Sequence, residues 1–430
     1  MFKLIGILIT SVIFSFYFFP FEFTFLPAGL NTKMLLAGCS LPVLAYNLIR
    51  DGRGELDSGF LKLSVIALLV SLMSYAAVAV NSTNDFTYVS YIVSMWVWLG
   101  GAYIVAQLVK AVHGRFTVTL LCHYLIGVCV AQCLIAYAMD VNAPLKSFVD
   151  SFLAGTGFMG KSEDRLYGIG ASLDVAGMRF SVALVMAVYL MTTRCVGENV
   201  LRDWLCLLSY LVIIVLGSMI ARTTYIGVIF SLLYAAYRGL TAGGGTLVPM
   251  LRKAVLLGCL FTPFLIWFYH ANVPFHENIR FAFEGFFSLV EKGRWEVHSN
   301  DILQNMYVLP DNLKTWLVGD GYMENPYGDP YYTGSRYGGF YMGTDIGYLR
   351  FIFYFGLPGL LLFIYYMYSC ARICMRRLPA CRELLVAILL INYVVWCKVS
   401  SDLFIVFALF LCLPSEEADE EEAPLTIPQA

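Results

Sequence analysis

The sequence predicts an all-α polytopic integral membrane protein with about twelve transmembrane helices and a large outer-face loop region that contains amphipathic helices. Of its 430 residues, 59% are hydrophobic and only 13% are charged. A soluble domain of this size carries about 25% charged residues. The apolar residues fall in repeated long runs, and the mean hydropathy is +0.72. Such repetition indicates a series of membrane spans rather than one large soluble core.

The first apolar run extends from Leu4 to Phe19 and follows a single early lysine, Lys3. No small-residue cleavage site follows it, so we interpret it as a retained helix and not as a signal peptide. The spans that we expect in order lie near residues 4–20, 34–49, 60–80, 88–109, 116–138, 176–193, 204–218, 223–238, 254–270, 346–368, 384–397 and 402–413.

The short connections separate by charge, because basic residues gather in alternate loops. The basic residues assigned to the cytoplasmic side are Arg50, Arg53, Lys110, Arg115, Arg194, Arg202, Arg238, Arg252, Lys253, Arg372, Arg376, Arg377 and Arg382. Cytoplasmic loops of membrane proteins are enriched in Lys and Arg, so this pattern predicts that both termini are cytoplasmic.

Arg222 is the only charged residue between Trp204 and Arg238 in a very apolar stretch. A single long helix there would reverse the charge pattern of every later loop. Two short helices that meet near residues 217–219 preserve the pattern and place Arg222 just inside the outer end of the second helix. A cation at bilayer depth is costly, so it usually faces a wet cavity or an anionic partner. The polar stretch 398–402 separates the last two spans in a similar way and is either a turn or a cavity lining.

Two long loops divide the chain into regions. These are 1–139, N-terminal helices; 140–175, outer loop; 176–270, central helices with the short pair 204–238; 271–345, large outer loop; 346–413, C-terminal helices; and 414–430, acidic cytoplasmic tail. Within the large loop, residues 276–306 have helical spacing of apolar side chains, which predicts amphipathic helices across the outer mouth. The aromatic stretch 327–343 suits either stacking on sugar rings or an aromatic belt at the membrane interface.

Three arginines near the outer face are candidates for binding an anion such as pyrophosphate. Arg165 precedes two glycines, Arg179 opens a helix, and Arg222 lies beside an apolar turn. Guanidinium groups bind phosphate oxygens in a bidentate manner. The competing interpretation is that these side chains reach from the membrane to the interface without a ligand.

Asp345 stands at the outer entrance of a helix, with Arg350 about one turn further in. It is either a helix cap or a base that accepts a proton from a hydroxyl nucleophile. His276 and His298, in the large outer loop, are the other candidate bases. The sequence has no nucleotide-binding loop and no zinc-protease motif. The cysteines of SCARICMRRLPACRE have no histidine among them, so we expect neither a metal nor a cofactor.

Three segments resemble the O-antigen polymerase and O-antigen ligase superfamily of bacterial membrane glycosyltransferases. They are RLYGIGASLDVAG at 165–177, GSMIARTTYIGVIFSLL at 217–233, and LVGDGYMENP followed by TDIGYLRFIFYFGLPGLLLF. The resemblance covers roughly 165–368 at the level of motifs, and the expected order of spans and loops agrees with it.

The resemblance implies metal-independent transfer of a glycan from a polyprenyl (undecaprenyl) pyrophosphate at the periplasmic face of the bacterial inner membrane. It assigns Arg222 and Arg165 to the pyrophosphate and leaves the base open between Asp345, His298 and His276. The residues taken as further substrate-binding candidates are Arg179, Arg350, Arg336, His276 and Asp320. The implied partners are the lipid-linked oligosaccharide, the bilayer, and a chain-length regulator and flippase of the same pathway; no nucleic acid is expected.

The sequence favours a polymerase that joins repeat units into O-antigen, capsule or exopolysaccharide. Ligases of the superfamily often carry His-Asn where this chain has Thr344 and Asp345. The alternatives are a ligase that transfers lipid-linked glycan to an acceptor, a polysaccharide flippase or transporter, and a non-catalytic subunit of the same pathway. Transporters tend to have internal repeats and short outer loops, and the 271–344 loop argues against that class.

Overall fold

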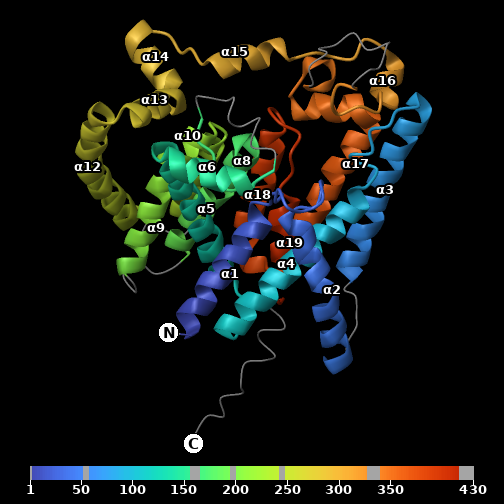
Figure 1. Ribbon diagram of the computed structural model, residues 1–430, viewed down its shortest axis with the longest axis horizontal. Coiled ribbons are helices and arrows are strands. Elements are labelled where there is room, and N and C mark those ends of the chain that lie inside the picture. Colours follow the sequence, from blue (N-terminus) through green and yellow to red (C-terminus); the bar gives the residue numbers. More distant parts are fainter. Residues whose placement is uncertain are drawn as a thin grey trace, which may run out of the picture.

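The computed structural model describes residues 2–51, 58–154, 165–193, 200–241, 247–326 and 339–415. Within these ranges the regular elements are helices, and strand-like pairing is limited to isolated bridges. The helices form a bundle, and a chain of short helices crosses one end of it (Figure 1). The predicted all-α class is therefore confirmed.

Among the described residues, 8 helices are long and apolar enough to cross a membrane. They are α2 (Thr32–Asp51), α3 (Ser58–Asn81), α4 (Tyr91–His113), α5 (Val118–Val141), α8 (Leu173–Thr192), α9 (Val200–Val212) with its continuation, α12 (Leu247–Ala271) and α17 (Gly347–Arg377). These helices confirm a polytopic membrane protein. The count of about twelve spans stays a prediction.

The other four expected spans contain shorter or less apolar helices. These are α1 (Phe2–Phe18), α11 (Thr224–Thr241), α18 (Arg382–Val395) and α19 (Phe404–Leu411). Helix α19 has 8 residues, all of them buried. At about 1.5 Å per residue it is roughly 12 Å long, far less than the ~30 Å hydrocarbon layer. The expected span 402–413 is therefore too short to cross a membrane by itself.

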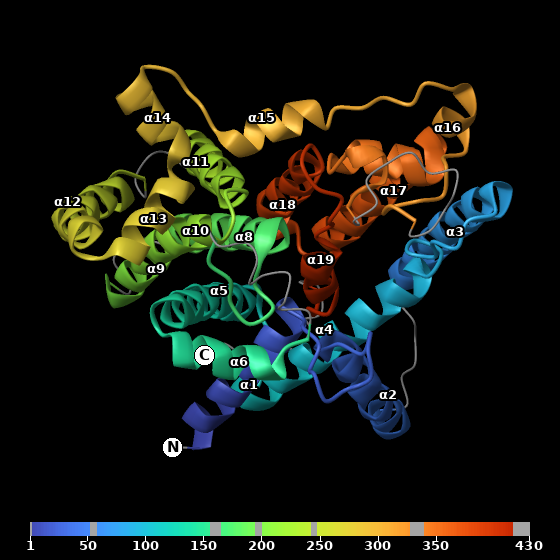
Figure 2. The same ribbon diagram turned by 45° about the horizontal axis from the view of Figure 1, so that its top comes forward.

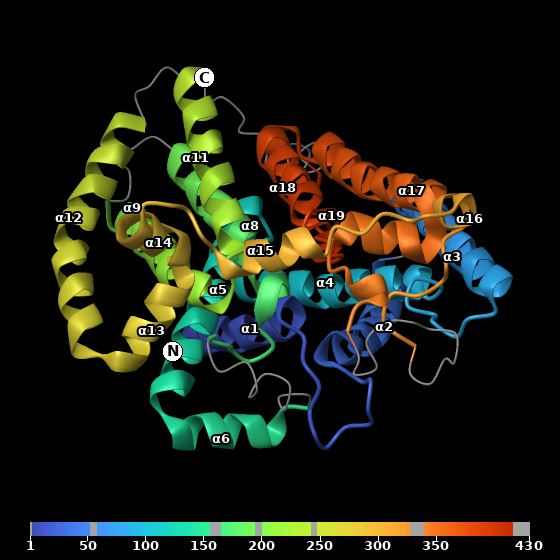
Figure 3. The same cartoon turned by 90° about the horizontal axis from the view of Figure 1, so that it is seen from above.

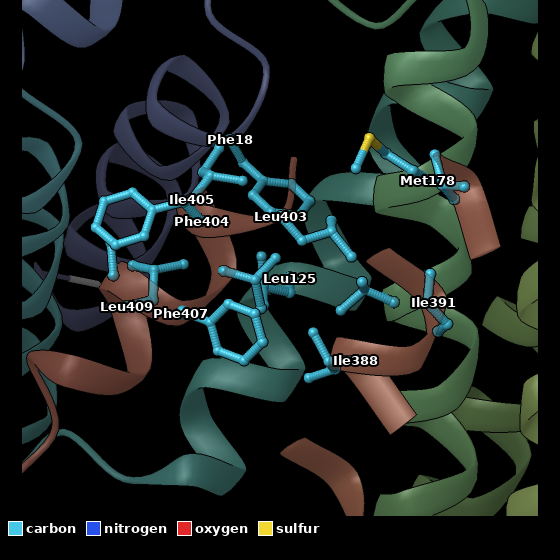
Figure 4. Packing of buried hydrophobic residues seen from close by; sticks show 14 of the residues in the cluster. Phe18, Leu125, Met178, Ile388, Ile391, Leu403, Phe404, Ile405, Phe407 and Leu409 are labelled. Carbon is cyan, nitrogen blue, oxygen red and sulfur yellow. The ribbon is translucent and has the colours of Figure 1, made fainter. Parts of the chain in front are cut away.

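Helix α19 instead forms the centre of the apolar core. Figure 4 shows Phe404, Phe407 and Leu409 packed among Phe18 of α1 and Leu125 of α5, with side chains of α8 and α18 beside them. Its composition is uniformly apolar because every side has a protein neighbour.

The stretch 204–238 is two helices, as predicted, but the break lies later than expected. Helix α9 continues through a π-helical turn, η1 (Ile213–Gly217), and a short helix, α10 (Ser218–Ile220), before α11 begins. Gly217 keeps helical torsion angles, whereas Ala221 is extended, with φ −154°. The chain therefore turns at residues 221–223, not at 217–219, and Arg222 lies in that turn rather than inside the second helix.

Helix α17 is kinked beside Gly356 and Pro358. Phe355 and Gly356 have non-helical torsion angles, and Gly356 has φ 72°. A Cβ on Gly356 would lie 2.6 Å from the backbone of Leu317, so only glycine fits this approach. The helix also extends to Arg377, beyond the expected end at residue 368. Arg372, assigned to a loop, is therefore helical.

The large loop contains the expected amphipathic helices. They are α13 (Val273–Ala282), α14 (Glu284–Lys292), α15 (His298–Asn305) and α16 (Leu313–Leu317). From α13 to α16 this segment crosses one end of the bundle, opposite the ends of α2 and α4 (Figures 1 and 2). We call residues 273–317 the strap. The loop 140–175 contains a helix that was not expected, α6 (Ala143–Phe152). Two short 3-10 turns, η2 (Tyr341–Gly343) and η3 (Pro379–Cys381), flank α17.

Candidate functional site

The site is built on a close crossing of α8 and α11. A Cβ on Gly227 would lie 2.3 Å from Ser181 Cα, and one on Gly177 would lie 2.9 Å from Thr223 Cβ. Ser181 Oγ donates to the Thr223 carbonyl at 3.0 Å and accepts from Gly227 N–H at 3.0 Å. Small residues allow two backbones in a membrane to approach this closely. The crossing fixes the turn that carries Arg222 against α8.

Arg165 reaches the same place through the segment that follows it. The Leu166 N–H donates to the Met219 carbonyl at 3.3 Å. Ile169 N–H donates to Gln132 Oε1 at 2.9 Å, and Gly170 has φ 72° where a Cβ would lie 2.4 Å from the Phe19 carbonyl oxygen. The RLYGIGAS segment is thus held against α5, α10 and the end of α1, and its first residue lies near the Arg222 turn.

The Arg222 guanidinium binds the strap through three groups. Nε donates to the Phe281 carbonyl at 3.0 Å, Nη1 donates to Ser299 Oγ at 2.8 Å, and Nη2 lies 2.6 Å from Glu284 Oε2. Glu284 Oε1 also accepts the His298 N–H at 3.2 Å. Arg222 therefore connects the α10–α11 turn to α13, α14 and α15, and it does not extend into lipid.

A cavity of about 1020 Å³ lies between this turn and the strap, and we call it the arginine cavity. The residues that matter for its chemistry are Arg165, Arg222, Phe281, Glu284, His298 and Ser299. Figure 3 looks down on the strap above it. The guanidinium carbons of Arg222 and Arg165 lie 4.1 and 5.0 Å from the Phe281 ring centroid. The cavity thus brings together both arginines predicted to bind pyrophosphate and one of the three candidate bases, His298.

The lining of the arginine cavity has more carboxylates than cations: the carboxylates are Asp140, Glu277, Glu284, Glu291, Glu296 and Asp301, and the cations are Arg165, Arg222, Arg280 and Lys292. Burial lowers the pKa of Arg222, Glu284 raises it and Arg165 lowers it, and an arginine with so high an ordinary pKa stays protonated at neutral pH. Arg280 pairs with Glu291 through two contacts of 2.8 Å. Within the described part of the chain, no carboxylate forms an ion pair with Arg165. Arg165 is therefore the cation available to an incoming anion, and Arg222 would share its charge between that anion and Glu284.

Asp345 lies in a second cluster, at the start of α17. A Cβ on Gly347 would lie 2.4 Å from the Val399 carbonyl oxygen, so α17 begins directly against the turn between α18 and α19. Asp345 Oδ1 is 3.5 Å from Arg350 Nη1. Burial raises the pKa of the Asp345 carboxyl to about 7, with Asp174 adding to the rise and Arg350 and Lys398 opposing it. A carboxyl with such a pKa can accept a proton near neutral pH.

Asp174 connects the two clusters. Its Oδ1 accepts from the Thr223 hydroxyl, next to Arg222, and from Lys398 Nζ at 2.7 Å. Asp174 lies in the first turn of α8, and Lys398 follows α18. The turn that holds Arg222 and the turn beside Asp345 are thus joined through one carboxylate.

One of the two interpretations of Asp345 was a helix cap, and the structure contains no cap hydrogen bond from its side chain to α17. The N-cap of α17 is Ile346, and no side chain caps it. The Ile346 N–H donates to Thr344 Oγ1 at 3.3 Å.

The remaining candidates lie away from the arginine cavity. Arg179 is in the second turn of α8, not at its start, and is buried with its guanidinium 5.5 Å from the Phe19 ring. Arg350 donates to the Met323 carbonyl at 3.0 Å. His276 stacks on Tyr269 with centroids 4.2 Å apart. Asp320 accepts from Thr315 Oγ1 at 2.8 Å and so holds the loop after α16.

Arg336 and most of the aromatic stretch 327–343 lie outside the described residues. The sequence analysis overlooked Phe281, Glu284 and Asp174. Phe281 has the helical spacing of an apolar face, and Asp174 lies within the RLYGIGASLDVAG segment, so both carried a sequence signal. Nothing in the sequence pairs Glu284 with Arg222, 62 positions earlier, because that contact depends on how the strap crosses the bundle.

Comparison of the chain with protein-family models, with curated proteins and with solved structures finds no match.

Proposed function

We propose that the protein is a membrane glycosyltransferase that polymerises oligosaccharide repeat units carried on undecaprenyl pyrophosphate. The observation that carries the proposal is the pair Arg165 and Arg222 beside one aromatic ring, in a cavity under the strap. Two guanidinium groups suit the two phosphates of such a donor, since each can bind phosphate oxygens in a bidentate manner. The cavity volume, about 1020 Å³, can hold a pyrophosphate with its first sugars.

In the proposed reaction the protein neutralises the charge of the leaving pyrophosphate and forms no covalent intermediate with the glycan. The bond between the anomeric carbon of the donor and the pyrophosphate oxygen breaks, and its electron pair leaves on that oxygen. Arg165 and Arg222 offset the negative charge that develops there. A hydroxyl oxygen of the acceptor forms the new bond to the anomeric carbon, and its proton passes to a base. Electrostatic stabilisation of this kind is worth about 10²–10³ in rate for each contact.

A polymerase is favoured over a ligase by the Thr344 and Asp345 pair, which stands where ligases of the superfamily often carry His-Asn. The long strap disfavours a transporter, since its helix α13 lines the cavity and is held there by hydrogen bonds from Arg222 and Tyr225 to the Phe281 and Ala282 carbonyls. The proposed setting is the bacterial inner membrane, with the strap facing the periplasm and with a flippase and a chain-length regulator as partners.

The test is the length distribution of surface glycan in a strain that lacks the protein. Loss of a polymerase leaves single repeat units attached to the acceptor lipid. Loss of a ligase leaves none attached and accumulates lipid-linked polymer, and loss of a flippase leaves repeat units on the cytoplasmic face. A ladder of normal length in the deletion strain would refute the proposal.

A further inference from the structure

A second cavity, of about 440 Å³, lies on another side of α15. The described residues that line it are Asn300, Leu303, Gln304, Tyr307, Ile346 and Cys397, and all are uncharged. We call it the amide cavity. Within the described part of the chain, the side-chain amides of Asn300 and Gln304 have no hydrogen-bond partner. Both residues are exposed, so their amides face solvent beside aliphatic and aromatic surface, and a ligand's hydroxyls can replace water there.

This composition suits a neutral, hydroxyl-rich ligand. An amide can donate to one hydroxyl and accept from another, and it does so without charge. The Tyr307 ring is 65% exposed, so its face can pack on the C–H face of a sugar. An anion would find no cation among the described lining residues. The arginine cavity and the amide cavity are thus chemically different.

Helix α15 separates the two cavities and contributes to both. His298 and Ser299 line the arginine cavity, whereas Asn300 and Gln304 line the amide cavity. Residues 299 and 300 face different sides because successive helical positions differ by about 100°. Ser299 and Gln304 are five positions apart, about 7–8 Å along the axis at 1.5 Å per residue. Ligands in the two cavities would therefore be neighbours on the scale of one sugar ring.

Asp345 is the sequence neighbour of a residue that lines the amide cavity. It directly precedes Ile346, and Cys397, an exposed lining residue, directly precedes Lys398. Lys398 binds Asp174, which also binds Thr223 beside Arg222. Asp174 and Lys398 both act electrostatically on the Asp345 carboxyl, so this carboxyl lies near the residues that connect the amide cavity with the Arg222 turn.

We propose, building on the proposed polymerase function, that the amide cavity binds the terminal saccharide of the acceptor and that Asp345 is the base that serves it. The acceptor hydroxyl gives its proton to the Asp345 carboxylate while its oxygen attacks the anomeric carbon of the donor held by Arg165 and Arg222. The pyrophosphate leaves with the electron pair of the broken bond. His298 and His276 are then not the base: His298 lines the arginine cavity, and His276 stacks on Tyr269.

Cys397 provides a direct readout, because its thiol is exposed in the amide cavity. The purified full-length protein is treated with a maleimide, and alkylation of the Cys397 peptide is followed by mass spectrometry. The probe is the lipid-linked repeat unit extracted from the deletion strain. We expect it to slow alkylation roughly tenfold once nine sites in ten are filled. Alkylation of Cys397 without the lipid-linked repeat unit gives the reference rate.

Variants separate this site from the donor site. Asn300→Ala with Gln304→Ala should abolish protection of Cys397 and raise the acceptor KM without changing the donor KM. Asn305→Ala is the matched control, since Asn305 is exposed on the same helix and outside both linings. Arg222→Ala should stop transfer but keep the protection. Cys397→Phe, which fills the cavity, should block lengthening, while Cys397→Ser should not.

Two results would overturn the acceptor assignment. One is unaltered alkylation of Cys397 by a wild-type protein that lengthens glycan in the same preparation. The other is a double amide variant that behaves like Asn305→Ala. Failure of the polymerase proposal itself looks different, because the wild-type protein would then not lengthen glycan at all.

Discussion

Arg222 and Phe281 contact each other twice: Nε of Arg222 donates to the Phe281 carbonyl at 3.0 Å, and the guanidinium lies 4.1 Å from the Phe281 ring centroid. Arg165 lies 5.0 Å from the same ring. One residue of α13 thereby orients two cations from different segments of the chain. Aromatic rings stabilise nearby cations by roughly 0.5–2 kcal/mol, so the ring partly offsets the repulsion between the two arginines.

Glu284 should act as an internal competitor for the anion. Its Oε2 lies 2.6 Å from Arg222 Nη2, and the Glu284 side chain as a whole is 33% exposed, so we take the pair to be worth about 0.2–1 kcal/mol. Glu284→Gln should therefore bind inorganic pyrophosphate about 1.5–5-fold more tightly. The measurement is calorimetric titration of the purified protein with inorganic pyrophosphate in the presence of a chelator.

Glu291→Gln is the control for this change, because Glu291 also lines the arginine cavity but pairs with Arg280. It should alter pyrophosphate affinity less than Glu284→Gln does. Weaker binding in Glu284→Gln would show that the carboxylate orients Arg222 for the anion and does not compete with it.

Asp345 should give the transfer reaction a pH dependence. Its pKa is raised to about 7 by burial, and a base must be deprotonated to act. The rate should rise through pH 7 and level off above it, and Asp345→Asn should lower it by about 10²–10⁴ and remove this rise. The measurement is the initial rate of lengthening between pH 5.5 and 8.5. An unchanged profile in Asp345→Asn would exclude this residue as the base.

The raised pKa of Asp345 also makes the stability of the fold depend on pH. Measuring this dependence tests whether the carboxyl is buried. The folded pKa lies above the ordinary value of 3.8, so the fold favours the protonated carboxyl. This contribution is present below about pH 4 and is lost as the pH rises to about 7. The thermal midpoint of the wild type should fall relative to that of Asp345→Asn across this window.

Gly227 should be the least replaceable glycine of the α8–α11 crossing. A Cβ there would lie 2.3 Å from Ser181 Cα, and overpacking of this kind typically costs about 1–3 kcal/mol. Gly227→Ala should lower the thermal midpoint in detergent and reduce the amount of inserted protein. Gly258→Ala in α12, where nothing lies within 4 Å, should leave both unchanged or improve them. Equal thermal midpoints and equal amounts of inserted protein for the two variants would mean that α8 and α11 can move apart without loss of stability.

The sequence predicts the fold where local pattern determines structure. Repeated apolar runs predicted the long helices, and the basic loops predicted that 204–238 is two helices. The sequence-based prediction was wrong where contacts with other parts of the chain determine the structure. Helix α19 has the composition of a span, yet it is a short core helix, because other helices and not lipid surround it. The turn fell at Arg222 and not at Gly217, because a π-helical turn lets α9 continue past the glycine.

The candidate site shows the same division. A cation in an apolar run is visible in the sequence, so Arg222 could be selected, and so could Arg165 from its glycine-rich setting. Glu284 and Lys398 could not, because their roles arise from contacts between distant segments, such as Lys398 with Asp174 at 2.7 Å. Arg179 has the same local signature as the other two arginines but faces Phe18 and Phe19 in the core.

The most direct test of the account replaces Arg165 and Arg222 separately by alanine in the deletion strain, at membrane levels matched to the wild type. Each variant loses one proposed contact to the leaving pyrophosphate, so lengthening should slow by about 10²–10³. Electrophoresis of surface glycan should then show mainly single repeat units instead of a ladder. Full-length ladders from both variants would contradict the account, because the arginine cavity would then not be the donor site.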